Sequence, residues 1–120
     1  MTTMAGTFDE TRLRRGIEQR DADMLISLYN DDAEVEIVDH TNSPSNPLIL
    51  RGHAEIRQTL EDVCARDMTH SLDRCVMYDD LAAYTESCRY PDGTCVLCNS
   101  MLDLENGRIS RQLMVQAWDE

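Results

Sequence analysis

At 120 residues the chain has room for one domain, and a hydrophobic fraction of 42% is sufficient for a folded core. Its formal charge of -12 is spread along the chain, which argues against nucleic-acid partners and anionic membrane surfaces. No stretch is long enough for a membrane span, and the start has neither the basic nor the apolar part of a signal peptide. We therefore expect a cytoplasmic protein with a single domain over residues 1–120, of which 1–7 form a flexible N-terminus.

The five cysteines are odd in number, and in a cytoplasmic chain we expect them to be reduced and packed as small apolar side chains. Cys95 and Cys98 have the spacing of a redox or zinc pair. They fall in a predicted strand, however, where positions three apart face opposite sides. Without a second pair, the pattern favours simple packing and predicts no metal site.

The first third of the chain predicts two helices. Thr7 and Glu10 have the spacing of a capping box, so a helix is expected from about residue 8. Its apolar stripe consists of Phe8, Leu13 and Ile17. Asp21 is expected to cap a second helix, which carries apolar residues as far as Tyr29.

A strand is predicted over residues 33–40, with Ala33, Val35 and Ile37 on one face. Asp39 continues that apolar face just before a loop rich in proline, asparagine and serine. Two interpretations are open: Asp39 starts the loop as an Asx turn, or it is the acid of a pocket. Residues 48–50 then form a short strand, and Gly52 opens a third helix.

From Met68 onward the apolar period changes to that of strands. Four runs of about ten residues are bounded by turn signals: 68–78, 81–90, 94–104 and 108–118. Pro91-Asp92-Gly93 predicts a three-residue hairpin loop that pairs Tyr90 with Thr94 and places Thr85 opposite Asn99. Three helices followed by an antiparallel meander indicate an α+β fold, with the helices packed on one face of a curved sheet.

This order of elements, with several local strings, resembles the nuclear transport factor 2-like superfamily, in particular its small bacterial SnoaL-like and ketosteroid-isomerase-like members. The matching strings are residues 28–36, Leu50-Arg51-Gly52, Pro91-Asp92-Gly93 and Asn106-Gly107-Arg108-Ile109. The resemblance implies a cone-shaped α+β barrel with three N-terminal helices on a curved, mainly antiparallel sheet, a cavity between the layers, and a homodimer. The fold hosts enzymes and binders, so it does not fix the function.

Carrying over the ketosteroid isomerase residues places the general-base Asp on Ile37, the oxyanion-hole Tyr on Leu13 and the protonated Asp on Asn99. Without that base and that phenol the isomerase proton shuttle cannot run, so we do not expect a steroid isomerase. His70 alternates with Met68 and Leu72, which places it on an inward face as either a core histidine or a cavity residue. Related cyclases and dehydratases favour the cavity.

We predict Asp39 and His70 as an acid/base pair, in which the carboxylate fixes the imidazole tautomer and raises its pKa. Asn99, Gln112 and Gln116 would orient a carbonyl oxygen, with Ile37 and Trp118 as further substrate-binding wall. In the last strand Gln112, Met114, Gln116 and Trp118 share one face; Leu113, Val115 and Ala117 share the other. If the first set lines the cavity, the second is free to form a dimer surface. The opposite assignment is open, as is the orientation of Glu86, Cys88 and Tyr90.

Together with the resemblance, these residues predict a cofactor-independent SnoaL-like enzyme that acts on an apolar, carbonyl-bearing small molecule by proton transfer, in a cyclisation, isomerisation or dehydration. The alternative is a non-catalytic dimeric module that binds a hydrophobic ligand or a protein partner. No phosphate-binding loop, nucleophile elbow or dinucleotide fingerprint is present.

Overall fold

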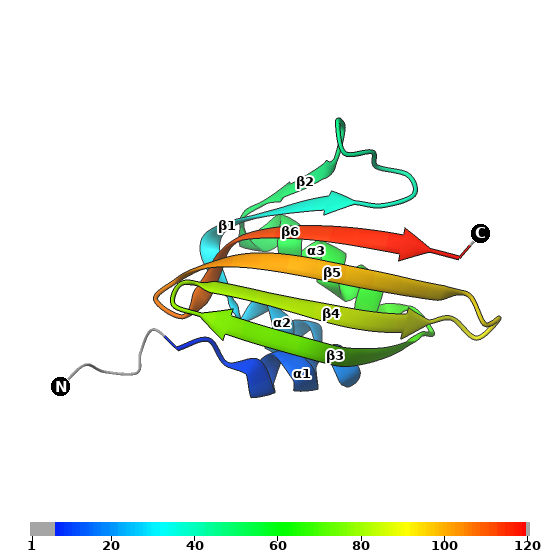
Figure 1. Cartoon of the computed structure of the whole chain (residues 1–120), viewed down its shortest axis with the longest axis horizontal. Coiled ribbons are helices and arrows are strands. Elements are labelled where there is room, and N and C mark those ends of the chain that lie inside the picture. Colours follow the sequence, from blue (N-terminus) through cyan, green and yellow to red (C-terminus); the bar gives the residue numbers. More distant parts are fainter. Residues whose placement is uncertain (1–6, 120) are drawn as a thin grey trace.

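The structure is a computed structural model, and it describes residues 7–119 (Figure 1). Except for Thr7, the N-terminus predicted to be flexible lies outside the described residues. The elements in chain order are α1 (Glu10–Glu18), α2 (Ala22–Ile26), β1 (Tyr29–Val38), β2 (Leu48–Arg51), α3 (Gly52–Ala65), β3 (Thr69–Tyr78), β4 (Leu81–Arg89), β5 (Cys95–Glu105) and β6 (Arg108–Trp118). The strands form one sheet in the order β2-β1-β6-β5-β4-β3.

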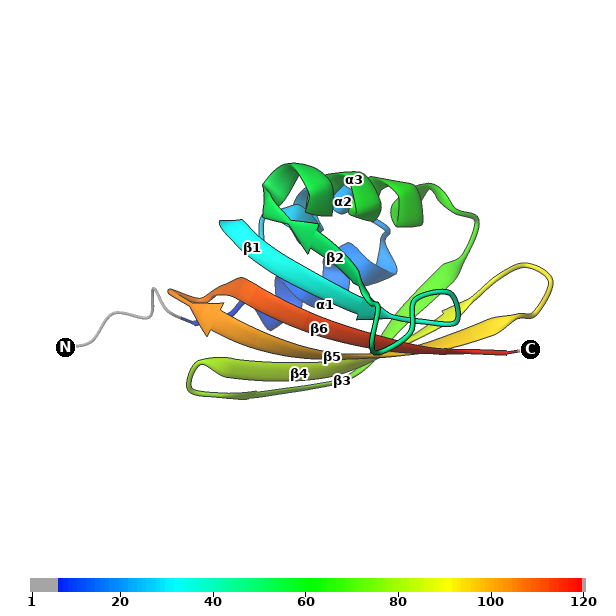
Figure 2. The same cartoon turned by 90° about the horizontal axis from the view of Figure 1, so that it is seen from above.

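The three helices lie on one side of the curved sheet, which leaves its other side open (Figure 2). Neighbouring strands are antiparallel, except that β1 and β6 run parallel. The main core lies between the two layers, where Ile56 of α3, Leu102 of β5 and Ile109 of β6 are almost fully buried. This confirms the predicted α+β architecture.

The first two helices start after acidic caps, although the first cap differs from the prediction. Asp9, not Thr7, caps α1, and its carboxylate accepts a hydrogen bond from Arg12 N at 2.9 Å. Asp21 caps α2 as predicted, accepting from Met24 N at 3.0 Å. The second helix ends at Ile26 and not at Tyr29, because Tyr29 already belongs to β1.

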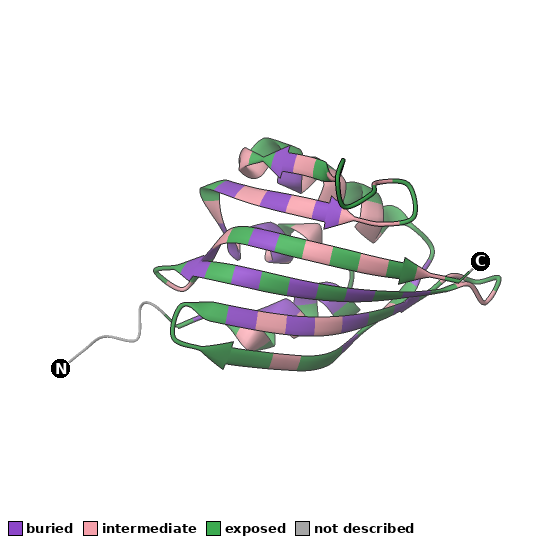
Figure 3. Cartoon of the chain, turned by 45° about the horizontal axis from the view of Figure 1, so that its top comes forward, coloured by how far each residue is buried: buried purple, intermediate pink, exposed green. Residues whose placement is uncertain are grey.

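The hairpin between β4 and β5 has the predicted register. Tyr90 N donates to Thr94 O at 2.9 Å, and Thr85 lies opposite Asn99. Burial then alternates without interruption along β5, as the purple and green bands of Figure 3 show. Val96, Cys98 and the later even-numbered positions of β5 therefore face the helices, and the odd-numbered ones face outward.

The cysteines also follow the strand pattern. Cys95 is exposed and Cys98 is buried, so the two sulfurs lie on opposite faces of the sheet. All five cysteines have free thiols. None of the helices in residues 7–119 has the length and apolar character needed to cross a bilayer.

Candidate functional site

A cavity of about 140 Å³ lies between the inner face of the sheet and the three helices. Most of its wall is apolar, with Ile17 and Leu28 on the helix side and Val35 and Met114 on the sheet. The ionisable or amide side chains that reach it include His70, Glu86, Arg66, Gln112 and Gln116. An apolar pocket with a few convergent polar groups is the usual form of a small-molecule site.

His70, Glu86 and Cys88 form a largely buried cluster on this wall. His70 Nδ1 lies 3.1 Å from Glu86 Oε2 and 3.1 Å from Cys88 Sγ, and the Cys88 thiol donates to Glu86 Oε2 at 3.4 Å. The residue opposite His70 in the β3–β4 ladder is Cys88, so the contact with Glu86 is a diagonal one. Two adjacent strands thus bring a carboxylate, an imidazole and a thiol together.

The hydrogen bonds with Cys88 and Glu86 raise the pKa of His70 to about 9, against the effect of burial. The pKa of the Cys88 thiol is itself strongly raised, because Cys88 hydrogen-bonds to Cys98 and is buried. Cys88 therefore stays a neutral thiol, and the negative charge that favours a protonated imidazole comes from Glu86. This arrangement makes Cys88 a poor nucleophile.

Both contacts of the imidazole use Nδ1, which leaves Nε2 without a hydrogen-bond partner among the described residues. No buried side-chain nitrogen in residues 7–119 lacks a partner, so Nε2 must retain accessible surface. His70 lines the cavity. Glu86 can thus hold one ring nitrogen while the other is free to exchange a proton with a ligand.

Asp39 does not pair with His70, contrary to the predicted geometry. Its Oδ1 accepts hydrogen bonds from the backbone and side chains of Thr41 and Asn42, at 2.8–3.0 Å. Asp39 is also not among the described residues that line the cavity. It is the Asx turn that starts the loop, which was the other interpretation left open by the sequence.

Asn99 is likewise misplaced for substrate binding. It is exposed on the outer face of β5, where its Oδ1 accepts from the Thr85 hydroxyl at 3.2 Å. The position was chosen by resemblance, and the alternation of β5 overrides it. The other predicted wall residues line the cavity: Ile37, Gln112, Gln116 and Trp118. Their part in substrate binding stays a prediction.

The sequence left the orientation of Glu86 undecided, because both faces of its strand carry apolar and polar residues. The structure turns Glu86, Cys88 and Tyr90 toward the cavity. The signal that could have found them was the hairpin register, combined with burial along the neighbouring strand. Glu86 lies opposite Cys98, a buried position of β5.

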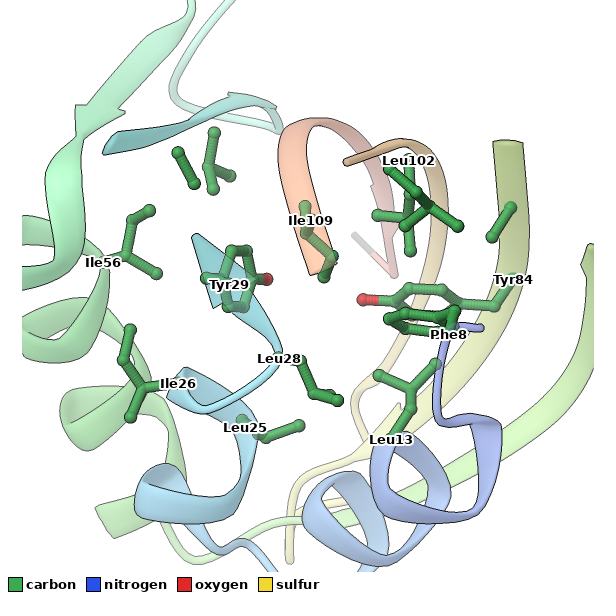
Figure 4. Packing of buried hydrophobic residues seen from close by; sticks show 14 of the residues in the cluster. Phe8, Leu13, Leu25, Ile26, Leu28, Tyr29, Ile56, Tyr84, Leu102 and Ile109 are labelled. Carbon is green, nitrogen blue, oxygen red and sulfur yellow. The ribbon is translucent and has the colours of Figure 1, made fainter. Parts of the chain in front are cut away.

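A second polar group lies in the same wall, deeper under the helices. Gln112 accepts a hydrogen bond from the Tyr29 hydroxyl, and its Nε2 donates to the Tyr84 hydroxyl oxygen at 3.2 Å and to Ser100 Oγ at 3.0 Å. Figure 4 shows the Tyr29 and Tyr84 hydroxyl groups pointing toward one another inside the core. Gln112 is therefore fixed by three neighbours and cannot turn freely toward a ligand.

His70, Glu86 and Cys88 also place three potential metal-ligand atoms within 4.8 Å of one another. Each of these atoms also takes part in a hydrogen bond within the cluster.

The match to known folds is broad, although sequence identity is low. A nuclear transport factor 2-like protein from Mesorhizobium loti superposes with a TM-score of 0.77 at 16% identity, covering 89% of this chain and 86% of that one. A candidate ketosteroid isomerase from Kribbella flavida DSM 17836 superposes with a TM-score of 0.73 at 16% identity, covering 92% of this chain and 74% of that one. A nuclear transport factor 2-like protein from Burkholderia xenovorans LB400 superposes with a TM-score of 0.74 at 15% identity, covering 92% of this chain and 79% of that one.

At these identities the likeness shows the fold alone. No curated protein matched the chain. The family model of the SnoaL-like domain matches residues 11–112, which span all three helices and most of the sheet. By this match and by its nuclear transport factor 2-like fold, the chain belongs to the SnoaL-like domain family.

Proposed function

We propose that this chain is a cofactor-independent enzyme that moves a proton on an apolar, carbonyl-bearing small molecule, as in a cyclisation, isomerisation or dehydration. The observation that carries the proposal is the 3.1 Å contact between His70 Nδ1 and Glu86 Oε2 on the cavity wall. Glu86 takes the part that the sequence had suggested for Asp39. A cytoplasmic homodimer is part of the same proposal.

In this mechanism Glu86 accepts from His70 Nδ1–H, which fixes the ring and sets the tautomer. Nε2 then gives a proton to, or takes one from, the bound molecule. The apolar wall around the pair excludes water and strengthens the interaction between carboxylate and imidazole. General acid/base catalysis of this kind contributes roughly 10²–10⁴-fold to a rate.

Deuterium exchange tests this proposal with simple ketones in place of the natural substrate. Small apolar ketones are incubated with the protein in D₂O, and loss of the protons next to the carbonyl is followed by NMR. We expect exchange above background with the unaltered protein and not with His70→Gln. If the unaltered protein exchanges every ketone no faster than His70→Gln does, the proposal is contradicted.

A non-catalytic ligand-binding module is the second candidate. It is favoured by the two apolar residues, Leu13 and Ile37, at the positions of the isomerase phenol and base. Ketone binding without any exchange would support this candidate over the enzyme.

A further inference from the structure

The deep polar group of the cavity has more hydrogen-bond donors than it uses. Tyr29 gives its hydroxyl hydrogen to Gln112 Oε1, and Gln112 gives its amide hydrogens to Tyr84 and Ser100. The hydrogens of the Tyr84 and Ser100 hydroxyls then remain to be placed. No described residue other than these two provides an acceptor for either of them.

Tyr84 and Ser100 lie opposite each other in the β4–β5 ladder, and each hydroxyl oxygen accepts from Gln112 Nε2. Ser100 is completely buried and is not among the described residues that line the cavity, whereas Tyr84 is. Of the two hydroxyls, that of Tyr84 is therefore the one that a ligand in the cavity can reach.

The Tyr84 oxygen accepts from Gln112 Nε2, and its own O–H has no acceptor among the hydrogen bonds of residues 7–119. Accepting this hydrogen bond polarises the O–H. Burial also raises the pKa of Tyr84 well above 10, so the hydroxyl keeps its hydrogen.

We propose that Tyr84 is the residue that binds the carbonyl oxygen of the ligand, through the unused hydrogen of its hydroxyl, with Gln112 as its positioning residue. This inference rests on the proposed function for the class of ligand. It moves the carbonyl contact from Gln112, whose amide hydrogens are already used, to its phenol neighbour.

The placement also orients the ligand. Tyr84 and Glu86 face the same side of β4, two residues apart, which is roughly 7 Å along a strand. His70 lies opposite Cys88, two residues further on. The carbonyl oxygen would therefore lie at the deep end of the cavity and the carbon that exchanges its proton nearer to His70.

The test compares 1-indanone with indane, two compounds of nearly equal shape that differ in the carbonyl oxygen. Binding of each is measured by calorimetry to the unaltered protein, to Tyr84→Phe and to Tyr90→Phe. Tyr90 also lines the cavity, but its hydroxyl accepts from Arg66 Nη1 at 3.2 Å at an exposed contact, where water can take its hydrogen. Tyr90→Phe is therefore the matched control.

We expect the unaltered protein and Tyr90→Phe to bind 1-indanone more tightly than indane. Tyr84→Phe should reduce that preference by about three- to tenfold, as the loss of one hydrogen bond predicts, while indane still binds. Retained indane binding shows that the variant is folded. An unchanged preference in Tyr84→Phe, equal binding of both compounds to the unaltered protein, or no binding of either would overturn the inference.

The His70→Gln variant separates this inference from the proposed function. It should lose deuterium exchange and keep the preference for 1-indanone. A protein that shows the Tyr84-dependent preference but no exchange would bind carbonyl compounds without acting on them.

Discussion

Glu86 contacts His70 across the diagonal of the β3–β4 ladder, with Oε2 of the carboxylate 3.1 Å from Nδ1 of the ring. The side chains of His70 and Glu86 are 5% and 12% exposed, so the two form a largely buried pair. A surface pair of this kind would be screened by water, whereas a buried pair holds one geometry. The first prediction follows from this contact.

Replacing His70 by Gln should lower ketone deuterium exchange by roughly 10²–10⁴-fold, because the ring nitrogen that exchanges the proton is lost. Glu86→Gln should lower it less, since the ring remains but its orientation and charge are no longer set by a carboxylate. NMR exchange rates measure both effects, and circular dichroism checks the fold. Full activity in His70→Gln would remove His70 from the mechanism.

The second prediction concerns pH. The pKa of His70 is raised from 6.5 to about 9 by Cys88 and Glu86. Because the folded value lies above the unfolded one, the contribution of this group to stability is complete below pH 6.5 and is lost as the pH rises through 9. NMR titration of the imidazole measures the pKa of His70. Urea unfolding between about pH 6 and 10 measures how the free energy of unfolding changes with pH.

The same titration separates the two causes. Glu86→Gln should bring the pKa of His70 back toward 6.5, whereas Cys88→Ser should leave it raised, because the buried thiol is neutral and the carboxylate carries the charge. A larger decrease of the His70 pKa in Cys88→Ser than in Glu86→Gln would mean that the thiol is the main partner.

The third prediction separates Asp39 from the chemistry. Burial acts to raise the pKa of Asp39, but the hydrogen bonds from Thr41 and Asn42 outweigh it and lower the pKa below 3.8. Since the folded value is the lower one, this stabilisation is present above pH 3.8 and is lost as the pH falls below it.

Asp39→Ala should therefore lower the free energy of unfolding by about 1 kcal/mol at neutral pH, measured with urea, because the loop loses its turn. Ketone exchange should be unchanged. Loss of exchange with normal stability would restore Asp39 as the catalytic acid.

The fourth prediction concerns the open side of the sheet. Large apolar residues are exposed there on the two central strands β5 and β6: Leu97, Met101, Leu113 and Val115. Exposed apolar residues gathered on one face of an otherwise acidic protein are typical of an interface, and we propose that this face pairs two copies of the chain.

Val115→Glu should convert a dimer into a monomer in sedimentation equilibrium, because it would bury a carboxylate in the proposed interface. Val76→Glu, on the edge strand β3, is the control and should leave the dimer intact. A monomeric unaltered protein would refute the proposed interface.

The order of helices and strands was readable from the sequence because it depends on local signals. The Pro91-Asp92-Gly93 turn set the β4–β5 register, and the apolar period distinguished α3 from the later strands. The first cap lies two residues beyond the predicted one, since Thr7 and Asp9 are both residue types that cap helices.

The candidate site was only partly readable. His70 was correctly placed inward by its alternation with Met68 and Leu72. Its carboxylate partner was not found, because Glu86 is 16 residues away and its strand carries apolar and polar residues on both faces. Alternation points to Asp39 and the resemblance points to Asn99. Neither signal shows which face of the strand is buried in the folded protein.

The sequence by itself determined the α+β layout, the SnoaL-like resemblance and an inward histidine, because periodicity, caps and turns act over a few residues. Only the tertiary structure decided that Glu86 holds that histidine, that Asp39 holds its own loop, and that Tyr84 has a hydroxyl hydrogen to offer. The contacts of Glu86 and Tyr84 join different strands, and curvature and register of the sheet set which side chains meet.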